Sequence, residues 1–351
     1  MKNNPTDKPK KIQKPDYVKD PMDRRAFFTK VAVAGGITGA AGYAALAPEN
    51  WPGSMKDMTG LRSEPKITPL TLKDFRVEKP ALAADIGIGR QGTPREKLLA
   101  ALDGIGGIAH YIKPGDIVLV KPNVAFDRAP NLGATSNPEL LQEIIRLLLV
   151  DCRAQEVRVA DNPIESPADC FAKSQISGAT LNNGGRVYLP DSNAFKMLNT
   201  PGAKLIENWW FFHRPFTNVD KVIGLAPIKD HNLCSASIGM KNWYGLLGGT
   251  RNQFHQDIHE IVSDLSIMIR PTMTILDGSN ILMQNGPTGG DPSNVKKGDA
   301  VLASVDPVAC DAWAFEHLLE RGRDYPTYLL KAEEKGAGKL DWEGRIKEVL
   351  G

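Results

Sequence analysis

The sequence predicts an α/β fold with a mostly parallel sheet that is covered by helices on both faces. Short apolar segments of strand length alternate with segments that carry apolar residues at helical spacing. Such alternation is typical of parallel sheets in which helices form the crossovers. The chain has 351 residues, of which 42% are hydrophobic, so it is long enough to bury a large core.

The expected elements follow one another closely after residue 76. Helical spacing is found at residues 95–102, 138–150 and 309–319. Asn137 is well placed to cap the second of these helices. The expected strands run over residues 116–121, 156–161, 221–226, 273–277 and 300–304. We therefore expect residues 76–351 to form a single α/β domain.

One segment, at about residues 188–219, interrupts this alternation. An aromatic run at 209–212 lies there between turn-rich stretches. We expect a small inserted aromatic-rich subdomain. A lid over a site and simple packing beneath a long loop are the alternatives.

The N-terminus carries the pattern of a twin-arginine export signal. Arg24 and Arg25 precede two phenylalanines and a weakly apolar stretch at 31–46, and small residues follow at 45–47. The apolar stretch is shorter than the roughly 20 residues of a membrane span. We expect a signal at 1–47, a linker at 48–75, and export by the twin-arginine translocase to the periplasm or another extracytoplasmic compartment. Retention as an anchor and a buried Ala/Gly helix are the alternatives.

Charge and cysteine usage limit the possible partners and cofactors. Residues 1–47 hold nine Lys/Arg and four Asp/Glu, which leaves 34 basic and 37 acidic residues in the remainder. A nucleic-acid partner is therefore not expected. The four cysteines, Cys152, Cys170, Cys234 and Cys310, form no closely spaced set. No iron–sulphur cluster is expected within this chain. For the cysteines themselves, disulfide bonds and four buried free thiols are both possible.

Charged and amide side chains follow all five expected strands. In parallel sheets, ligands bind beyond the carboxyl ends of the strands, so these residues are expected to line one shared site. They are Lys121 and Asn123, Asp161, Lys229 and His231, Asp277, and Asp306 with Asp311.

The segment 237–260 holds further candidates for anion binding. Lys241 and Asn242 follow a glycine, and Gly248 and Gly249 would let the backbone approach a ligand closely. Arg251 and the start of the next expected helix favour an anion there. The loop 285–292 contains glycines that could form an anion nest, although a plain flexible loop is the equal alternative.

Histidines and aspartates suggest a metal ion as a second possibility. His255 and His259 are four residues apart, a spacing that places both on one face of a helix. Gln256 occupies the position where a zincin motif requires glutamate. The expected metal ligands are His231, His255, His259, Asp161, Asp277 and Asp306. The alternative for this pair is that one histidine has its hydrogen-bond partners within the protein and the other is exposed to solvent. The GxGxxG pattern at 87–92 lacks the preceding strand and following acidic residue of a dinucleotide site.

Several of these motifs together resemble the domain-of-unknown-function family 362. The resemblance runs from about residue 85 to the C-terminus and rests on the motifs Lys-Pro-Asn at 121–123, Lys-x-His at 229–231 and Lys-Asn-x-x-Gly at 241–245. Members are sometimes joined to cysteine-rich iron–sulphur modules, which this chain lacks. A fainter similarity links the chain to nickel-dependent lactate racemases, as an analogy only.

Three functions fit these observations. The first is an exported metal- or cofactor-dependent enzyme that acts on a small anionic substrate. Its catalytic residues would be Lys229, His231 and Lys241, and its substrate-binding residues Lys121, Asn123, Asn242, Gly248, Gly249 and Arg251. The second is a redox accessory protein with an iron–sulphur partner protein. The third is a non-catalytic protein that binds an anion or a metal. The cofactor is unknown, and a metal ion is the possibility that the residues suggest.

Overall fold

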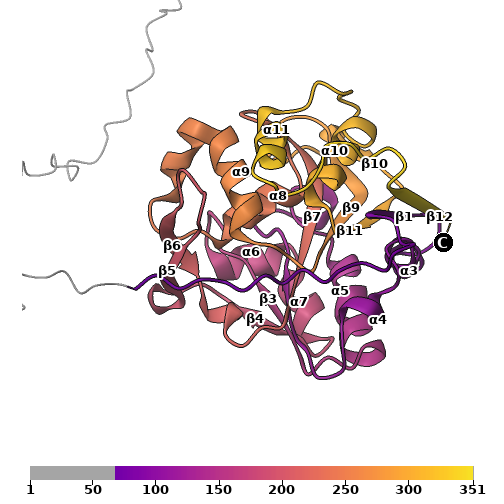
Figure 1. Ribbon diagram of the computed structural model, residues 1–351, viewed down its shortest axis with the longest axis horizontal. Coiled ribbons are helices and arrows are strands. Elements are labelled where there is room, and N and C mark those ends of the chain that lie inside the picture. Colours follow the sequence, from indigo (N-terminus) through magenta and orange to yellow (C-terminus); the bar gives the residue numbers. More distant parts are fainter. Residues whose placement is uncertain (1–67, 351) are drawn as a thin grey trace, which may run out of the picture. The chain divides into compact units, whose positions relative to one another are not determined.

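The computed structural model of the protein describes residues 68–350, which belong to one compact unit (Figure 1). The predicted export signal and most of the predicted linker lie outside the described residues. Within residues 68–350, no helix combines the length and apolar character needed to cross a membrane.

A ten-stranded sheet forms the centre of the fold, with the order β12-β1-β11-β9-β7-β2-β3-β4. β9, β7, β2, β3 and β4 run parallel to one another, and β12 runs parallel to β1. β8 and β10 pair antiparallel with β7 and β9. The sheet is mostly parallel, which confirms the predicted α/β class. Its strands are β1 (Ile86–Arg90), β2 (Ile117–Lys121), β3 (Glu156–Ala160), β4 (Arg186–Tyr188), β7 (Lys221–His231), β8 (Ser235–Ser237), β9 (Met273–Leu282), β10 (Val295–Lys297), β11 (Val301–Ser304) and β12 (Ile346–Leu350).

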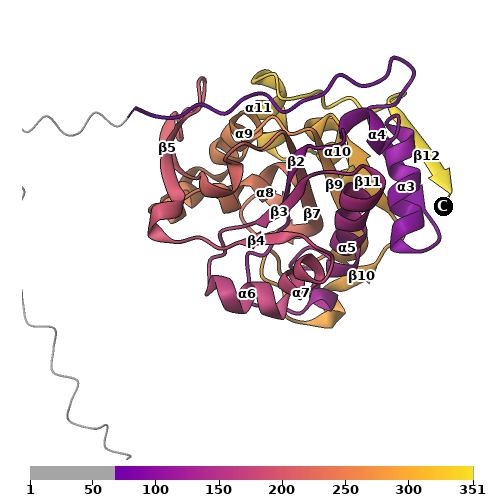
Figure 2. The same cartoon turned by 90° about the horizontal axis from the view of Figure 1, so that it is seen from below.

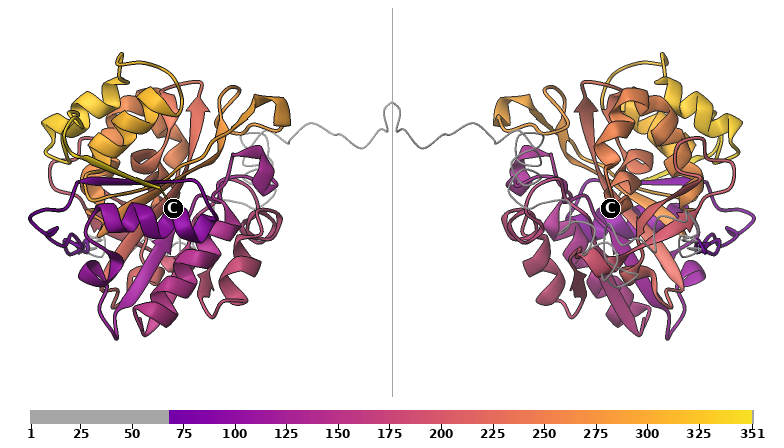
Figure 3. Two further views of the ribbon diagram at one scale, coloured as in Figure 1. Left: turned by 90° about the vertical axis from the view of Figure 1, so that its right-hand side faces the viewer. Right: turned by 90° about the vertical axis from the view of Figure 1, so that its left-hand side faces the viewer.

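Helices cover both faces of this sheet (Figures 2 and 3). Val118 and Val120 of β2 pack with helices of the first half of the chain, whereas Leu119 packs with helices of the second half, as expected for alternate residues of a strand. Asn137 accepts a hydrogen bond from the Glu139 N–H, so the predicted cap is confirmed. The first-half helices are α3 (Pro94–Gly104), α4 (Ile108–Tyr111), α5 (Pro138–Arg146), α6 (Pro167–Lys173) and α7 (Ile176–Leu181). The second-half helices are α8 (Gly239–Asn242), α9 (Ile258–Met268), α10 (Pro307–His317) and α11 (Thr327–Glu334).

One strand departs from the expectation that all five strands end at the same edge. β11 pairs antiparallel with both β9 and β1, and Ser304 lies opposite Thr274 near the start of β9. Between β9 and β11 the chain forms β10 and a three-residue 3₁₀ helix (Pro292–Asn294) but no α-helix. Parallel neighbours need a long crossover, but antiparallel neighbours do not. The residues that follow β11, including Asp306, therefore lie at the opposite edge of the sheet from those that follow β2 and β3.

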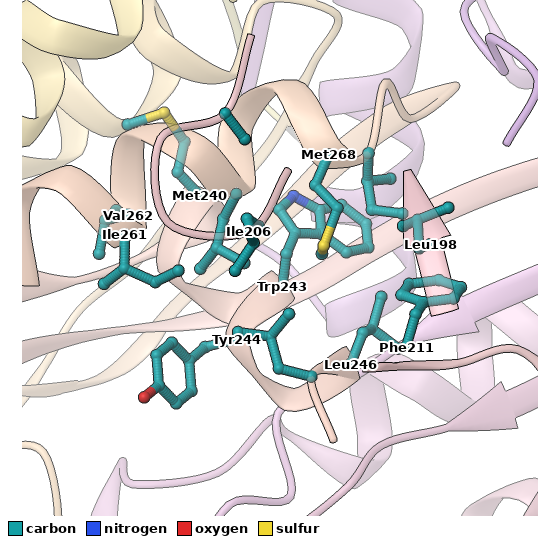
Figure 4. Packing of buried hydrophobic residues seen from close by; sticks show 14 of the residues in the cluster. Leu198, Ile206, Phe211, Met240, Trp243, Tyr244, Leu246, Ile261, Val262 and Met268 are labelled. Carbon is teal, nitrogen blue, oxygen red and sulfur yellow. The ribbon is translucent and has the colours of Figure 1, made fainter. Parts of the chain in front are cut away.

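A separate two-stranded antiparallel sheet occupies the expected insertion. It consists of β5 (Phe195–Asn199) and β6 (Asn208–Phe212). Phe211 and Phe212 are buried, and the rings of Trp209 and Phe254 pack edge-on with centroids 4.7 Å apart. Figure 4 shows Phe211, Leu246 and Trp243 in one core cluster. The hairpin thus supports the segment after α8, which contributes much of the site described next.

Candidate functional site

A small cavity lies beyond the carboxyl ends of β2 and β3, beside the second half of β7. Its volume is about 60 Å³. A water molecule needs roughly 10–15 Å³ of such space, so the cavity has room for several water-sized groups. Nine of the predicted site residues line it, namely Lys121, Asn123, Asp161, Lys229, His231, Lys241, Asn242, Arg251 and His255.

Lys121, at the end of β2, is held by a complete set of partners. Its Nζ lies 2.7 Å from Oδ1 of Asp161 and donates to Oδ1 of Asn242 at 2.9 Å and to the Pro122 carbonyl at 2.8 Å. An ammonium group has three hydrogens, and each has an acceptor here. Burial lowers the pKa of Lys121, and the Asp161 carboxylate opposes that shift.

Asn242 and Asn123 join this ion pair to the strands. Asn242 accepts from Lys121 and from Nδ2 of Asn123, and its own amide donates to the carbonyls of Lys121 and Leu225 at 3.1 Å. Asp161 also accepts from the backbone N–H of Val124 at 2.6 Å. We call Lys121, Asn123, Asp161 and Asn242 the Lys121 network. Its polar groups are largely occupied within the protein, so the network lines the cavity but leaves few groups to bind a ligand.

Gly245 explains the last position of the Lys-Asn-x-x-Gly motif. A Cβ atom at this residue would lie 1.9 Å from Oδ1 of Asp161 and 2.8 Å from Nζ of Lys121. Only glycine leaves room for the ion pair at this point.

Lys229 lies in the part of β7 that extends past the predicted strand end. β8 pairs back on this extension, with Lys229 opposite Ser237. The Lys229 Nζ donates to the Ala134 carbonyl at 2.6 Å and to Oδ1 of Asn123 at 3.2 Å. Burial, and then the nearby charges of Lys241 and Lys121, lower the pKa of Lys229 to about 7. The neutral amine is therefore much more accessible to this side chain near neutral pH than to an ordinary lysine.

Lys241 lies on α8 and has no opposing charge. Within residues 68–350, its Nζ has no hydrogen-bond or ion-pair partner, although it lies 5.3 Å from the centre of the Tyr244 ring. Burial, together with Arg251, lowers the pKa of Lys241. α8 itself is fixed by Asp311 of α10, whose carboxylate accepts from the N–H groups of Gly239 and Met240 at 2.9 Å. Burial raises the pKa of Asp311 to about 7.

His231 presents a hydrogen-bond donor to the cavity. Its Nδ1 lies 3.1 Å from the Leu233 N–H, which can only donate. Burial, with Lys241 and Lys229 nearby, lowers the pKa of His231 to about 2. The imidazole is therefore neutral and carries its proton on Nε2. In this state Nε2 can donate to an anion but has no lone pair for a metal ion or a proton.

His255 has the opposite tautomer. Its Nδ1 lies 3.1 Å from the Asn252 carbonyl, which can only accept, and 3.3 Å from the Tyr244 hydroxyl. The proton is therefore on Nδ1, and Nε2 has a free lone pair. Burial lowers the pKa of His255, which keeps the ring neutral near pH 7. His255 is the histidine of the cavity that can accept a proton.

Arg251, Gly248 and Gly249 have structural roles rather than the predicted role in anion binding. The Arg251 guanidinium donates to four backbone carbonyls, those of Tyr244, Leu247, Asn162 and Pro163. A Cβ atom at Gly248 would lie 2.5 Å from the Phe195 ring, and one at Gly249 would lie 3.3 Å from Trp210. The glycines allow close packing against the β5–β6 hairpin, and neither lines the cavity.

The six predicted metal ligands do not form one set, since Asp161, His231 and His255 line the cavity and the other three do not. His255 lies in a 3₁₀ helix (Arg251–Asp257) that ends before α9 begins, so the expected α-helical face is not shared. His259 instead stacks on Tyr328, with ring centroids 6.1 Å apart. Among residues 68–350, no group of three or more His, Cys, Asp or Glu side chains could hold a metal ion. The four cysteines are free and buried.

The two remaining aspartates lie away from the cavity for reasons of topology. Asp277 is inside β9, opposite Val301 of β11, and accepts from Ser279. Asp306, at the opposite edge of the sheet, caps α10 by accepting from Val308 and Ala309 and pairs with Arg345. The carboxylates of Asp277 and Asp306 are therefore not placed to bind a metal ion together with the histidines of the cavity.

Other residues lining the cavity had no predicted role, namely Phe126, Ser237 and Tyr244. Tyr244 follows Asn242 in the motif at 241–245, and its position in that motif is the one signal that pointed to it. Ser237 lies opposite Lys229 in a pairing that the strand pattern did not indicate.

Comparison with known proteins supports the family resemblance. Over 238 residues, which are 63% of this chain and 68% of its relative, the protein is 27% identical to thylakoid-associated protein sll1697 of Synechocystis sp.. The family model for "Domain of unknown function (DUF362)" matches residues 118–316. This match begins in β2, ends in α10 and includes the whole lining of the cavity, so the chain belongs to the DUF362 family.

Proposed function

We propose that the protein is an enzyme that binds the anionic group of a small substrate in this cavity. The observation that carries the proposal is Lys241, a buried lysine in the lining of the cavity for which residues 68–350 supply no counter-charge and no hydrogen-bond acceptor. Burying an unpaired charge is costly, and an anion in the cavity would remove that cost. The one carboxylate in the lining, Asp161, is already bound to Lys121.

The neighbouring side chains suit an anionic substrate and proton transfer. The neutral His231 offers its Nε2–H to an anion, and His255 offers a free Nε2 lone pair as a general base. The amine of Lys229 supplies a second basic group in the same cavity. These groups favour acid–base chemistry by the protein's own side chains, in place of the metal site that the sequence suggested.

Calorimetric titration with acetate and inorganic phosphate tests the binding step. The parent protein is expected to bind at least one of them, and Lys241→Met is expected to weaken that binding by tenfold or more, since about 1.4 kcal/mol corresponds to tenfold. Lys113→Met, which changes an exposed lysine outside the cavity, is the matched control. Equal affinities in the parent protein and Lys241→Met would contradict the proposal, and a protein that binds but turns over no substrate would favour the non-catalytic alternative.

We also propose that the protein acts outside the cytoplasm. The order of Arg24, Arg25, the apolar stretch and the small residues supports export, and the relative from Synechocystis is described as thylakoid-associated. Replacement of both arginines by lysine is expected to leave the protein in the cytoplasmic fraction of fractionated cells. Unchanged distribution would contradict export by the twin-arginine translocase. A redox partner protein stays a prediction from the family resemblance.

A further inference from the structure

We propose that Lys229 forms an imine with the carbonyl group of a small 2-oxo acid whose carboxylate is bound by Lys241. The inference rests on the proposed function, since it assigns a substrate class and a covalent step to the same cavity.

The surroundings of Lys229 suit a neutral amine. A primary amine has two hydrogens and one lone pair, and the protein supplies two acceptors, the Ala134 carbonyl and Oδ1 of Asn123. With both hydrogens held, the remaining direction of Nζ is available for the lone pair. Lys229 lines the cavity, so that lone pair can reach a bound molecule. A desolvated lysine beside another cation is a known form of activated amine nucleophile.

Comparison with Lys121 shows why Lys229 is the nucleophile. Lys121 has three acceptors, one of them the Asp161 carboxylate, and is therefore stabilised as an ammonium ion. Lys229 has no carboxylate among its hydrogen-bond partners. The two lysines lie in the same cavity, but their partners favour opposite protonation states.

The cavity suits a small substrate. Its volume of about 60 Å³ is room for several water-sized groups, since a water needs about 10–15 Å³. Glyoxylate and pyruvate are of this size. Their carboxylate would satisfy Lys241, and the Nε2–H of His231 would donate to the carbonyl or carboxylate oxygen. A carboxylate and a carbonyl on adjacent carbons match an ammonium and an amine that line one small cavity.

The step is balanced without an oxidant or reductant. The Lys229 lone pair forms a C–N bond to the carbonyl carbon while the C–O π bond breaks. His255 takes one proton from the nitrogen and gives it to the carbonyl oxygen, which yields a neutral carbinolamine. His255 then takes the second proton from the nitrogen and gives it to the hydroxyl group. The C–O bond then breaks and releases water, so one amine and one carbonyl give one imine and one water.

Reductive trapping tests the inference. The full-length protein is incubated with pyruvate and sodium cyanoborohydride, and the adduct is measured by intact mass and located by peptide mapping. We expect one reduced pyruvate adduct per chain, on Lys229. Propionate, which lacks the carbonyl group, is expected to bind in calorimetry but to leave no adduct. Lys229→Arg should abolish the adduct and still bind pyruvate, while Lys113→Met should behave as the parent protein.

The outcomes separate this inference from the proposed function. If pyruvate binds but no adduct forms, or if the adduct lies on another lysine, the imine is ruled out and anion binding stands. If pyruvate, propionate, acetate and phosphate all fail to bind, the proposed function fails as well.

Discussion

Two groups of residues meet at the cavity and differ in how their polar atoms are used. The Lys121 network satisfies its groups internally, with an ion pair and amide hydrogen bonds between strand ends. Lys229, His231, Lys241 and His255, which we call the Lys241 group, have fewer partners within residues 68–350. Lys229 donates to two acceptors without a carboxylate among them, and the Lys241 Nζ, the His231 Nε2 and the His255 Nε2 have no hydrogen-bond partner in the described part of the chain. The network explains how the strand ends are held together. Under the proposed function, the Lys241 group is where a bound anion is expected to add stability.

The contrast teaches that cationic residues of one cavity need not share one role. Lys121, Lys241 and Arg251 are all buried. Lys121 has three acceptors and Arg251 donates to four carbonyls, whereas Lys241 has no acceptor in the described part of the chain. A buried charge without a partner destabilises the folded protein, so the position of Lys241 indicates a role other than stability. The comparison makes opposite predictions for two lysines that lie in the same cavity.

The largest expected effect comes from breaking the Lys121 network. Lys121→Met leaves the Asp161 carboxylate buried without its counter-charge, and loss of one partner of a buried pair costs about 3–5 kcal/mol. We expect the free energy of unfolding to fall by that amount in chemical denaturation.

A double variant separates this loss of a counter-charge from a packing defect. Lys121→Met combined with Asp161→Asn removes both charges, and it should recover part of the stability lost in the single variant. Asp161→Asn could instead lower the free energy of unfolding by the same amount in Lys121→Met as in the parent protein. That result would mean that loss of the ion pair is not the main cause of the stability lost in Lys121→Met.

Most of this site could be predicted from the sequence because parallel strands place their carboxyl ends together. Lys121, Asp161 and Lys229 follow or end strands of strong apolar character, and the structure brings all three to one cavity. The direction of β11 could not be read from the same pattern, since a short apolar segment pairs equally well in either direction. Asp306 was therefore placed at the wrong edge.

Side-chain roles were harder to predict than positions. The spacing of His255 and His259 indicates one helix face only if the helix is continuous, and the 3₁₀ segment that ends at Asp257 breaks it. Arg251 has the chemistry of an anion-binding residue, but four carbonyls surround it in the fold. Such partners come from distant segments, so local patterns do not reveal them.

The second prediction concerns Lys241 in the free protein. Lys241→Met removes a buried charge and leaves no acceptor without a donor in residues 68–350. The lost contact with the Tyr244 ring costs roughly 0.5–2 kcal/mol, and removal of the unpaired charge should exceed this. We expect the variant to be more stable by about 1–2 kcal/mol at pH 7, although it binds anions poorly. A clear loss of stability would mean that Lys241 is held by the fold rather than kept for a ligand.

The gain in the free energy of unfolding from Lys241→Met should depend on pH, and the lowered pKa of Lys241 sets the direction of that dependence. The fold lowers the pKa of Lys241, so between that lowered pKa and the ordinary lysine value of about 10.4 the unfolded chain binds more protons than the folded protein. The stability of the parent protein therefore rises with pH in this range. The advantage of the variant is expected to be largest at low pH and to shrink as pH rises toward 10. Denaturation at pH 6.5 and 9 measures it, and an advantage that grows with pH would contradict the assignment.

The smallest expected effect is proton uptake when an anion binds. A bound anion stabilises the charged form of Lys241 and raises its pKa toward the ordinary value, so binding at pH 8 should take up a fraction of a proton, at most about one per site. Calorimetry in phosphate-free buffers with different ionisation enthalpies measures this uptake as the slope of the observed binding enthalpy. Lys241→Arg provides the matched control, because arginine stays charged throughout this range. The arginine variant should bind with a smaller slope, and an equal slope in both proteins would assign the proton to Lys229 or to a histidine instead.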